Sequence, residues 1–495
     1  MTGKVYLIGA GPGDPGLLTR KGAEVLASAE VVVYDRLVGR EILAMMPRTA
    51  ELINVGKHAG NHPVPQEQIS QILLDKALKG KRVVRLKGGD CFLFGRGGEE
   101  LEPLFAHGVP FEVVPGVPSP IAATAYAGIP VTHRDYCSSV HFITGHKKKD
   151  GALDLDYEAL IRLDGTLVFL MSIGNCAEIA EGLLSHGMDP EMPCAVVENG
   201  TRPDQRKFTA PLRGLVDCVR DNGVISPALI IVGRVCTLSE RFDWFDALPL
   251  HGLRVLLTST AGSASRLKAR LDAWGADVTA LPAIEPRPLP FALPELDRYE
   301  LIAFSSAAGV RFFFEGLFAA GKDARALSGL RVAAVGRATA EALRGYGIAA
   351  DLVPGSYSGA AMAEAILASG VRAGARVLLA RPRKALPELP EKLRVAGVEA
   401  EELFVYETAP LPMERLDPAP FAWVCFTSPS CVERFAAACR EGGKELPAGL
   451  KALCIGESTA GAARAAGLET FVSAEATLEG MAETLLRLNT ERLER

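Results

Sequence analysis

The sequence lacks several features that mark common classes of protein. Its ten cysteines include no CxxC pair, so neither a zinc site nor a framework of disulfides is expected. No run of about 18 apolar residues predicts a membrane-spanning helix. Basic residues are not in excess, because the formal net charge is −5, and this argues against a general nucleic-acid binder.

Histidine is scarce in the second half of the chain, since seven of the eight histidines precede residue 190, so the two halves differ chemically. With 495 residues the chain exceeds what one core usually supports, and about three to four domains are expected. The first nine residues predict a strand that enters a glycine-rich loop rather than a signal peptide. Scattered cysteines are typical of reducing cytosol, so we expect a cytoplasmic protein.

Residues 83–100, VVRLKGGDCFLFGRGGEE, are the first candidate ligand-binding stretch. A short buried strand is predicted at 83–86, and 96–100 predicts the start of a helix. Between them, Gly88 and Gly89 let a ligand approach the backbone, and the Asp90 carboxylate can accept hydrogen bonds from a ribose or an ammonium group. A tight turn that needs glycine at positive φ explains the same residues, so both interpretations stay open.

A second glycine loop, GAGPGDPG at residues 9–16, follows the first predicted strand. Its GxGxxG spacing formally matches the fingerprint of dinucleotide-binding proteins, and Asp35 lies about 20 residues further on, where a ribose ligand belongs. However, two prolines remove backbone N–H groups that a pyrophosphate needs, and the Asp14 carboxylate repels phosphate. A nicotinamide cofactor is therefore the weaker alternative.

Predicted strands and helices alternate through the rest of the first half. This alternation favours two α/β lobes, divided near residues 114–120. The predicted helices are 66–78 and 120–127, and the predicted strands are 31–34, 111–114, 166–171, 195–198 and 227–232.

Eight motifs in the first 245 residues resemble, in their order, those of the tetrapyrrole methylases, and look most like uroporphyrinogen-III C-methyltransferase. They are GAGPGDPGLLT, VVVYDRLV, VGKHAG, RLKGGDCFLFGRGGEE, PGVPS…AYAGIPVTHR, TGH, VENGTRPDQ and SPALIIVG. The resemblance implies a two-lobed methylase domain at 1–245, with lobes at about 1–115 and 118–245. It further implies S-adenosylmethionine between the lobes and a homodimer formed through this half.

The same resemblance implies roles for individual residues. Asp35 and Lys57 take the positions of the proposed proton acceptor and proton donor. S-adenosylmethionine would give up its methyl group and leave as S-adenosylhomocysteine, and no metal is expected. The implied cofactor contacts are Pro12, Gly88, Gly89, Asp90, Leu93, Pro118, Ser119, Met171, Gly200 and Ala228.

The chemistry of the implied reaction fits these residue types. Methylation of an electron-rich pyrrole carbon leaves positive charge on the macrocycle, which Asp35 can stabilise or remove as a proton, while Lys57 can supply one. The implied substrate, uroporphyrinogen III, is a polycarboxylate that suits basic side chains. Solvated surface charge is the alternative for each of these side chains alone. The candidate carboxylate contacts are Arg96, His133, Arg134 and His146.

Three positions depart from the usual pattern of the family. Cys91 stands where proline is usual after Gly-Gly-Asp, and Ser172 stands where glycine commonly follows the Met171 position. Pro118 replaces a threonine and lacks both a hydroxyl and a backbone N–H, so a cofactor contact there must use Ser119 or a carbonyl.

An internal repeat fills the chain beyond residue 252, after a predicted linker at 246–251. The sequence RVLL at Arg254 recurs at Arg376, a shift of 376 − 254 = 122, and FSS at Phe304 recurs as FTS at Phe426 with the same shift. Two similar α/β units are therefore predicted within 252–490.

The second half resembles the uroporphyrinogen-III synthase family, through FSSAAGV, AVGRATAEAL, VYET, FTSPSCVERF and CIGESTAGAA. The resemblance implies two α/β lobes, one made of about 252–285 with 410–490 and the other of about 290–405. It implies a catalytic tyrosine at Tyr406 and no cofactor. The implied cleft-lining hydroxyls are Ser306, Thr339, Ser428 and Thr459.

Simpler interpretations of these side chains remain open. Thr339 and Thr459 both follow a Gly-x-x-Thr pattern at a strand-to-helix junction, where threonine commonly caps a helix. Tyr406 corresponds in the repeat to Ile284, because 406 − 122 = 284, so a buried core tyrosine is the alternative to a catalytic one.

Together the two resemblances imply a bifunctional enzyme of porphyrin biosynthesis with an α/β fold throughout. It would cyclise hydroxymethylbilane to uroporphyrinogen III and methylate that product twice to precorrin-2, towards sirohaem or cobalamin. No nucleic-acid or membrane partner is expected. The alternative is a methyltransferase of a later corrinoid, whose second half is a non-catalytic tetrapyrrole-binding or regulatory module.

Overall fold

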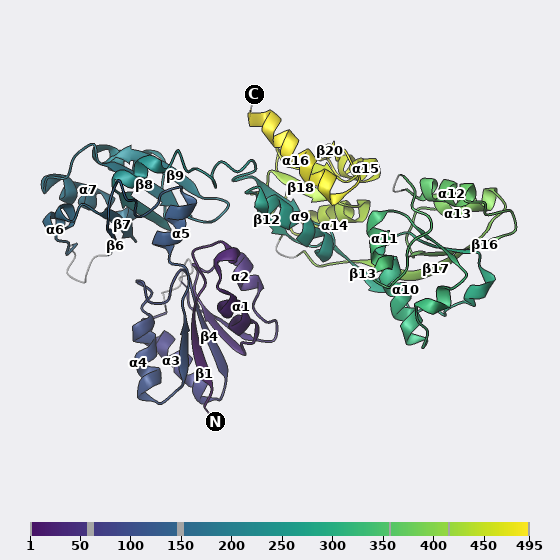
Figure 1. The fold of residues 1–495 in the computed structure, drawn as a ribbon, viewed down its shortest axis with the longest axis horizontal. Coiled ribbons are helices and arrows are strands. Elements are labelled where there is room, and N and C mark those ends of the chain that lie inside the picture. The colour runs from purple at the N-terminus through teal and green to yellow at the C-terminus, as the bar shows by residue number, and fades with distance from the viewer. Residues whose placement is uncertain (1, 57–63, 146–152, 356–357, 414–415, 494–495) are drawn as a thin grey trace. The chain divides into compact units, whose positions relative to one another are not determined.

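The computed structural model describes residues 2–56, 64–145, 153–355, 358–413 and 416–493 (Figure 1). The chain divides into two compact units, Met1–Leu253 and Arg254–Arg495. Within the described residues, each unit contains two five-stranded sheets with helices on their faces, so the predicted α/β fold class is confirmed. Within these described ranges, every helix is too short or too polar to cross a membrane.

The first sheet is parallel throughout, and helices cover both of its faces. Its strand order is β3 (Glu51–Asn54), β2 (Val31–Tyr34), β4 (Arg82–Lys87), β1 (Lys4–Gly9) and β5 (Phe111–Val114). The covering helices are α1 (Arg20–Ala27), α2 (Arg40–Ala44), α3 (Gln66–Leu78) and α4 (Gly97–Ala106). One face packs on Leu73 and Leu104 from α3 and α4, and the other packs on Leu26 and Ile42 from α1 and α2 (Figure 1). Strands buried on both faces explain the runs of valine and leucine in this lobe.

The second sheet of this unit is mixed rather than parallel. Its order is β6 (Val140–Thr144), β7 (Thr166–Leu170), β10 (Ala228–Val232), β8 (Pro193–Glu198) and β9 (Arg206–Pro211). Only β6 and β7 run parallel, and the other neighbours are antiparallel. Helix α5 (Ser119–Tyr126) packs on one face, and α7 (Cys176–Ser185) and α8 (Leu215–Asp221) pack on the other. A further short helix is α6 (Tyr157–Arg162).

The segment predicted to be a linker packs against the first unit. The side chain of Gln205 donates a hydrogen bond to Asp246 at 2.8 Å, and Lys207 makes an ion pair with the same carboxylate at 3.8 Å. His251 lies 3.0 Å from the carbonyl of Gln205, and Leu250 is fully buried. Residues 246–251 are therefore fixed by a polar network and by apolar burial.

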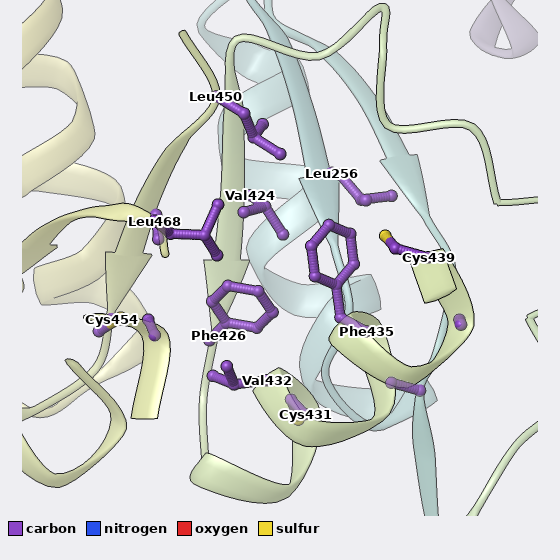
Figure 2. Close-up of a cluster of buried hydrophobic side chains, with 14 of the residues drawn as sticks. Leu256, Val424, Phe426, Cys431, Val432, Phe435, Cys439, Leu450, Cys454 and Leu468 are labelled. Atoms are coloured by element: carbon purple, nitrogen blue, oxygen red, sulfur yellow. The ribbon is translucent and has the colours of Figure 1, made fainter. Parts of the chain in front are cut away.

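The second unit combines strands from distant parts of the sequence in one sheet. This parallel sheet has the order β12 (Asp277–Ala280), β11 (Arg254–Leu257), β18 (Trp423–Phe426), β19 (Lys451–Cys454) and β20 (Glu469–Val472). Figure 2 shows Leu256 of β11 beside Val424, Phe426 and Phe435 in one core. The helices of this lobe are α9 (Ala261–Ala273), α14 (Pro429–Glu441), α15 (Glu457–Ala465) and α16 (Leu478–Leu493).

The intervening residues form the other lobe of the second unit. Its sheet order is β13 (Ile284–Pro288), β17 (Glu399–Pro410), β16 (Arg376–Pro382), β14 (Leu301–Phe304) and β15 (Arg331–Ala334). Its helices are α10 (Ala307–Ala319), α11 (Arg337–Arg344), α12 (Gly359–Ala368) and α13 (Glu388–Val395). The antiparallel pair β13 and β17 carries the chain into and out of this lobe. Each repeat therefore contributes strands to both sheets.

Candidate active sites

Three glycine-containing loops meet at the carboxyl ends of β1, β4 and β5. Gly11 and Gly89 exchange backbone hydrogen bonds, at 3.1 Å and 2.8 Å. Gly9 lies against Gly116 so closely that a Cβ on Gly9 would be 2.5 Å from the Gly116 nitrogen. Backbones can pack this tightly only without side chains. The glycine loops of the first and fourth strands are thus joined at the edge of the sheet where α/β proteins bind ligands.

Asp90 holds two of these loops together. One of its carboxylate oxygens accepts the N–H groups of Phe92 and Leu93, at 2.8 Å and 3.0 Å, and the other accepts the N–H of Gly116 at 3.1 Å. Both oxygens therefore have partners within the protein. Asp90 therefore fixes the conformation of the ligand loop, and Leu93 takes part by donating its backbone N–H to Asp90.

Gly89 leaves open space beside the beginning of helix α5. Its φ is +69°, and the nearest heavy atom to an added Cβ is the backbone nitrogen of Ser119, at 3.8 Å. Pro118 precedes the helix without a side-chain cap, so Ser119 offers the first helical amide there. The opening can accept a ligand group that the amides at a helix N-terminus favour, such as a carboxylate.

Backbone strain gathers in the loops that the sequence motifs single out. Met171, Asn199 and Thr201 have φ values of 53°, 52° and 70°, which are unusual for residues other than glycine. Met171 is also 52 % exposed. Gly200 packs directly on α5, since a Cβ there would be 2.2 Å from that of Ala123.

The remaining two predicted cofactor positions belong to different sheets, because Pro12 follows β1 and Ala228 is in β10. Pro12 is half-buried in the first glycine loop, between Gly11 and Gly13. Ala228 begins β10, where it pairs with Glu198 just before the strained Asn199 loop.

The internal hydrogen bonds of the first loop argue against a dinucleotide. The N–H of Gly16 donates to the Asp14 carboxylate at 2.6 Å, and the N–H of Asp14 donates to Thr201 at 3.2 Å. Tyr126 from α5 donates to the other oxygen of Asp14 at 2.5 Å. A pyrophosphate would find these amides already bonded and a carboxylate beside them. The loop instead contacts Tyr126 and Thr201, which belong to the lobe of the second sheet.

Asp35 is supported by a buried set of charges that the sequence reasoning missed. The Arg85 guanidinium lies 3.4 Å from Asp35 Oδ2, and its Nε donates to Glu100 at 3.2 Å. Lys87 and the side-chain amide of Gln66 donate to the same Glu100 oxygen, at 2.8 Å and 3.0 Å. The signal for this cluster was two basic residues inside an otherwise apolar parallel strand, where neither face is solvated.

The buried charges have a defined electrostatic balance. Burial opposes the ionisation of Glu100, but Arg85 and Lys87 together hold the pKa of its carboxyl below the usual range. Its Oε2 atom is buried without a hydrogen-bond partner among the described residues. Glu100 therefore stays charged and serves to hold the two cations in place.

The predicted carboxylate-binding residues differ in their availability. Arg96 makes a two-point ion pair with Glu99, at 2.6 Å and 3.0 Å, so it must exchange partners to bind a substrate. His133 accepts the N–H of Asp135 through its Nδ1, and Arg134 is exposed. Lys57 and His146 lie outside the described residues.

Two of the departures from the family pattern are buried. Cys91 is fully buried in the core between the first sheet, α3 and α4, and burial together with Asp90 raises the pKa of its thiol to about 12. Ser172 is buried and its hydroxyl donates to the carbonyl of Phe169 at 3.2 Å. Both residues therefore pack the protein rather than line the loop edge. Among the described parts of the chain, no cluster of three or more histidine, cysteine or acidic residues suits a metal ion.

In the second unit, Tyr406 and Ser306 lie together although 100 residues separate them. Their hydroxyl oxygens are 2.9 Å apart, and Ser306 caps helix α10 by accepting the N–H of Gly309 at 2.9 Å. Tyr406 is 8 % exposed. It belongs to the core of its lobe and also carries a hydroxyl with a defined polar partner.

The other three predicted hydroxyls belong to helix starts. Gly336 and Gly456 occupy the N-cap positions of α11 and α15, so the cap interpretation of Thr339 and Thr459 is wrong. Both threonines sit one turn further on and are 3 % exposed, so a substrate can reach them only if neighbouring residues move. Ser428 precedes α14 and lies 3.2 Å from the Cys431 sulfur.

Two family models match the chain. "Tetrapyrrole (Corrin/Porphyrin) Methylases" matches residues 4–216, and "Uroporphyrinogen-III synthase HemD" matches residues 265–483. The porphyrin biosynthesis protein HemD of Ruminiclostridium josui is 42 % identical over 498 residues, which cover 98 % of each chain.

Other relatives match the first half alone. Siroheme synthase 2 of Cronobacter sakazakii is 54 % identical over 245 residues, which cover 50 % of this chain and 53 % of that protein. The chain thus spans about half the length of that relative. The native crystal structure of uroporphyrin III C-methyl transferase from Thermus thermophilus is 43 % identical, with a TM-score of 0.41, and the match covers 48 % of this chain and 100 % of that one.

Proposed function

Because the chain belongs to the family in which a tetrapyrrole methylase is joined to a uroporphyrinogen-III synthase, we propose that it carries out two consecutive steps of tetrapyrrole biosynthesis. The first half is a methyltransferase and the second half a lyase. In the proposed sequence, the second half cyclises hydroxymethylbilane to uroporphyrinogen III, and the first half methylates it twice to precorrin-2. The observation that carries the proposal is the relative that matches both halves along 98 % of the chain.

The proposed methyl donor is S-adenosylmethionine, released as S-adenosylhomocysteine. The residues fit such a group, because Gly89 leaves space beside the Ser119 amide, and Met171, at another motif position, is half exposed and has a strained backbone. Gly88 packs closely on Leu37, since a Cβ there would lie 2.5 Å from that of Leu37, while Asp90 fixes the loop from within. S-adenosylmethionine supplies the methyl group, and the protein positions it against the ring.

Asp35 is proposed to handle the charge that methylation leaves on the macrocycle. Its carboxylate is partly exposed and is held by Arg85 and by the N–H of Leu37, at 3.4 Å and 3.1 Å. A carboxylate fixed in this way can stabilise a nearby cation or accept its proton. Lys57 stays the proposed proton donor, outside the described residues.

Ring closure is proposed to use Tyr406 as proton donor and no cofactor. Its phenol has a hydroxyl partner in Ser306, at 2.9 Å. The reaction requires the linear substrate to be folded and one proton to be delivered to the leaving hydroxyl. We further propose that the protein forms a homodimer through its first half. We also propose that it acts in the cytoplasmic synthesis of sirohaem or cobalamin.

One assay tests both halves. Purified protein is supplied with hydroxymethylbilane, with and without S-adenosylmethionine, and the products are followed by isomer analysis and mass. We expect the III isomer alone without the methyl donor, and a mass gain of two methyl groups with it. If the protein yields only the symmetrical isomer, which forms by spontaneous cyclisation, the synthase assignment is refuted. Absence of the mass gain from supplied III isomer would refute the methylase assignment, and methylation of later corrinoids alone would favour the alternative substrate.

A further inference from the structure

The hydroxyls of Ser306 and Tyr406 lie 2.9 Å apart, and either one can donate to the other. In one of the two arrangements, Ser306 Oγ accepts the N–H of Gly309 at 2.9 Å and donates its own proton to Tyr406 Oη. When the phenol oxygen accepts that hydrogen bond, the proton of Tyr406 is free to be given elsewhere. Burial raises the pKa of Tyr406, and the hydrogen bond with Ser306 lowers it. Accepting the bond therefore makes the buried phenol a better acid.

The second copy of the repeat provides an internal comparison. With the shift of 122, Ser428 corresponds to Ser306, and Ile284 corresponds to Tyr406. Ile284 packs in the apolar core that contains Phe426 and Phe435, and the Ser428 hydroxyl contacts the Cys431 sulfur at 3.2 Å. This copy thus keeps the serine but has no phenol for it to orient.

The two copies of the repeat also differ at the position of Gly309. Its counterpart is Cys431, because 309 + 122 = 431. A Cβ on Gly309 would lie 3.2 Å from Ser306 Oγ and 3.8 Å from Tyr406 Cε1. The absence of a side chain at Gly309 therefore keeps room for the serine–tyrosine contact, whereas Cys431 fills that room in the other copy.

We propose that Ser306 is a positioning residue that donates a hydrogen bond to Tyr406 and so directs the phenol proton to the leaving hydroxyl. The proton donor for ring closure then belongs to one lobe only, the lobe built on β13, β17, β16, β14 and β15. The inference rests on the proposed synthase function of the second half.

The step balances without a further reactant. The bond between the hydroxymethyl carbon and its oxygen breaks, both electrons go to the oxygen, and the Tyr406 proton converts the leaving hydroxide to water. The substrate keeps the positive charge while the carbon–carbon bond that closes the ring forms, and becomes neutral only when the ring carbon loses a proton. The proton then lost from the ring carbon returns to the phenolate, so Tyr406 is restored.

The test compares three single-substitution variants of the full chain. Ser306→Ala removes the hydroxyl, Ser306→Thr retains it, and Ser358→Ala is the matched control. Ser358 caps α12 by accepting the N–H of Ala361 at 3.1 Å, so its loss removes a helix cap without affecting Tyr406. We expect Ser306→Ala to lower kcat for formation of the III isomer about tenfold, as the loss of one hydrogen bond predicts, with KM little changed. Ser306→Thr and Ser358→Ala should retain the rate.

A second readout separates orientation of the phenol from helix capping. In protein carrying ¹³C at the tyrosine carbon bonded to oxygen, the resonance absent from Tyr406→Phe reports the titration of Tyr406. Ser306→Ala should move that titration to higher pH, because the phenolate loses a donor, and Ser358→Ala should not. An unchanged titration and an unchanged rate in Ser306→Ala would overturn the proposal.

Different results would refute the synthase function and the role of Ser306. If the unaltered chain makes no III isomer, the proposed synthase function fails and the role of Ser306 in ring closure fails with it. If the unaltered chain makes the III isomer and Tyr406→Phe makes it at the same rate, the synthase function stands, but Tyr406 is not the proton donor and the positioning role of Ser306 is overturned.

Discussion

The side chain of Arg85 on β4 reaches Asp35, the residue directly after the neighbouring parallel strand β2, with the Arg85 Nη2 atom 3.4 Å from Asp35 Oδ2. The guanidinium is almost completely buried, and its Nη1 atom also donates to the carbonyl of Leu86 at 3.0 Å. Its position is therefore fixed by the sheet. A fixed cation beside a partly exposed carboxylate holds that carboxylate at the loop edge of the sheet.

Substituting Arg85 by methionine should slow methyl transfer selectively. The change preserves bulk but removes the contact to Asp35, and loss of positioning of this kind is expected to lower kcat about tenfold or more. The measurement is turnover of uroporphyrinogen III with S-adenosylmethionine, alongside ring closure of hydroxymethylbilane. Arg82→Met on the same strand is the control, because Arg82 is exposed. Equal effects of the two substitutions would contradict a role for Arg85 in supporting Asp35.

Replacing Asp35 by asparagine should affect only the methyltransferase half. The amide cannot accept a proton or stabilise a cation as a carboxylate does, so methylation should fall by about a hundredfold or more. Affinity for S-adenosylmethionine, measured by calorimetry, should be retained, and so should formation of the III isomer. A parallel loss of both activities would instead indicate misfolding.

Local pattern was enough to predict many elements of the first unit. The strands at 31–34 and 111–114 and the helix at 66–78 have the predicted bounds. Valine runs marked these strands, and an amphipathic pattern after a proline marked the helix. The order of strands in each sheet and the mixed direction of the second sheet depend on contacts between distant segments, so local pattern could not predict them.

Site residues were predictable by position but not by role. The motif placed Asp90 in the ligand loop, yet which partners its oxygens bind depends on Gly116, 26 residues away. The repeat located Thr339 at a helix start, but the pattern could not distinguish the cap from a buried position one turn later, where the threonine lies. The link between Arg85 and Glu100 likewise required the pairing of a strand with a helix.

Introducing a methyl group at Gly89 should weaken cofactor binding. Gly89→Ala adds bulk to the space beside Ser119 and strains a backbone with φ of +69°, at a cost of about 1–2 kcal/mol. We expect the affinity for S-adenosylmethionine, measured by calorimetry without tetrapyrrole, to fall about tenfold or more. Ring closure should not change.

Gly108→Ala is the matched control for this substitution. Gly108 has a similar φ of +63° and open space around it, but it precedes β5, whereas the ligand loops follow their strands. The backbone strain is therefore comparable while the candidate site is untouched. If both alanine variants bind S-adenosylmethionine as the unaltered chain does, the Gly89 loop is not part of the cofactor site.

Removing the charge of Glu100 should destabilise the first unit in a pH-dependent manner. Glu100→Gln leaves Arg85 and Lys87 buried with less compensation, a change that typically costs about 3–5 kcal/mol near neutral pH. The folded pKa of Glu100 lies below 4.5, so its contribution is present above that pH and is lost as the pH falls through the folded pKa. The two proteins should therefore converge in stability in acid.

Hydrogen exchange of peptides covering β4 and α4, with denaturant at about pH 7 and at an acid pH below the folded pKa of Glu100, measures this difference. Glu102→Gln on the same helix is the control, because Glu102 is exposed and its substitution should change protection little at either pH. A constant gap between Glu100→Gln and the unaltered chain across this range would mean that the Glu100 carboxylate does not stabilise the cluster through its charge. The loss of protection should also extend to Asp35, because Arg85 connects the two carboxylates.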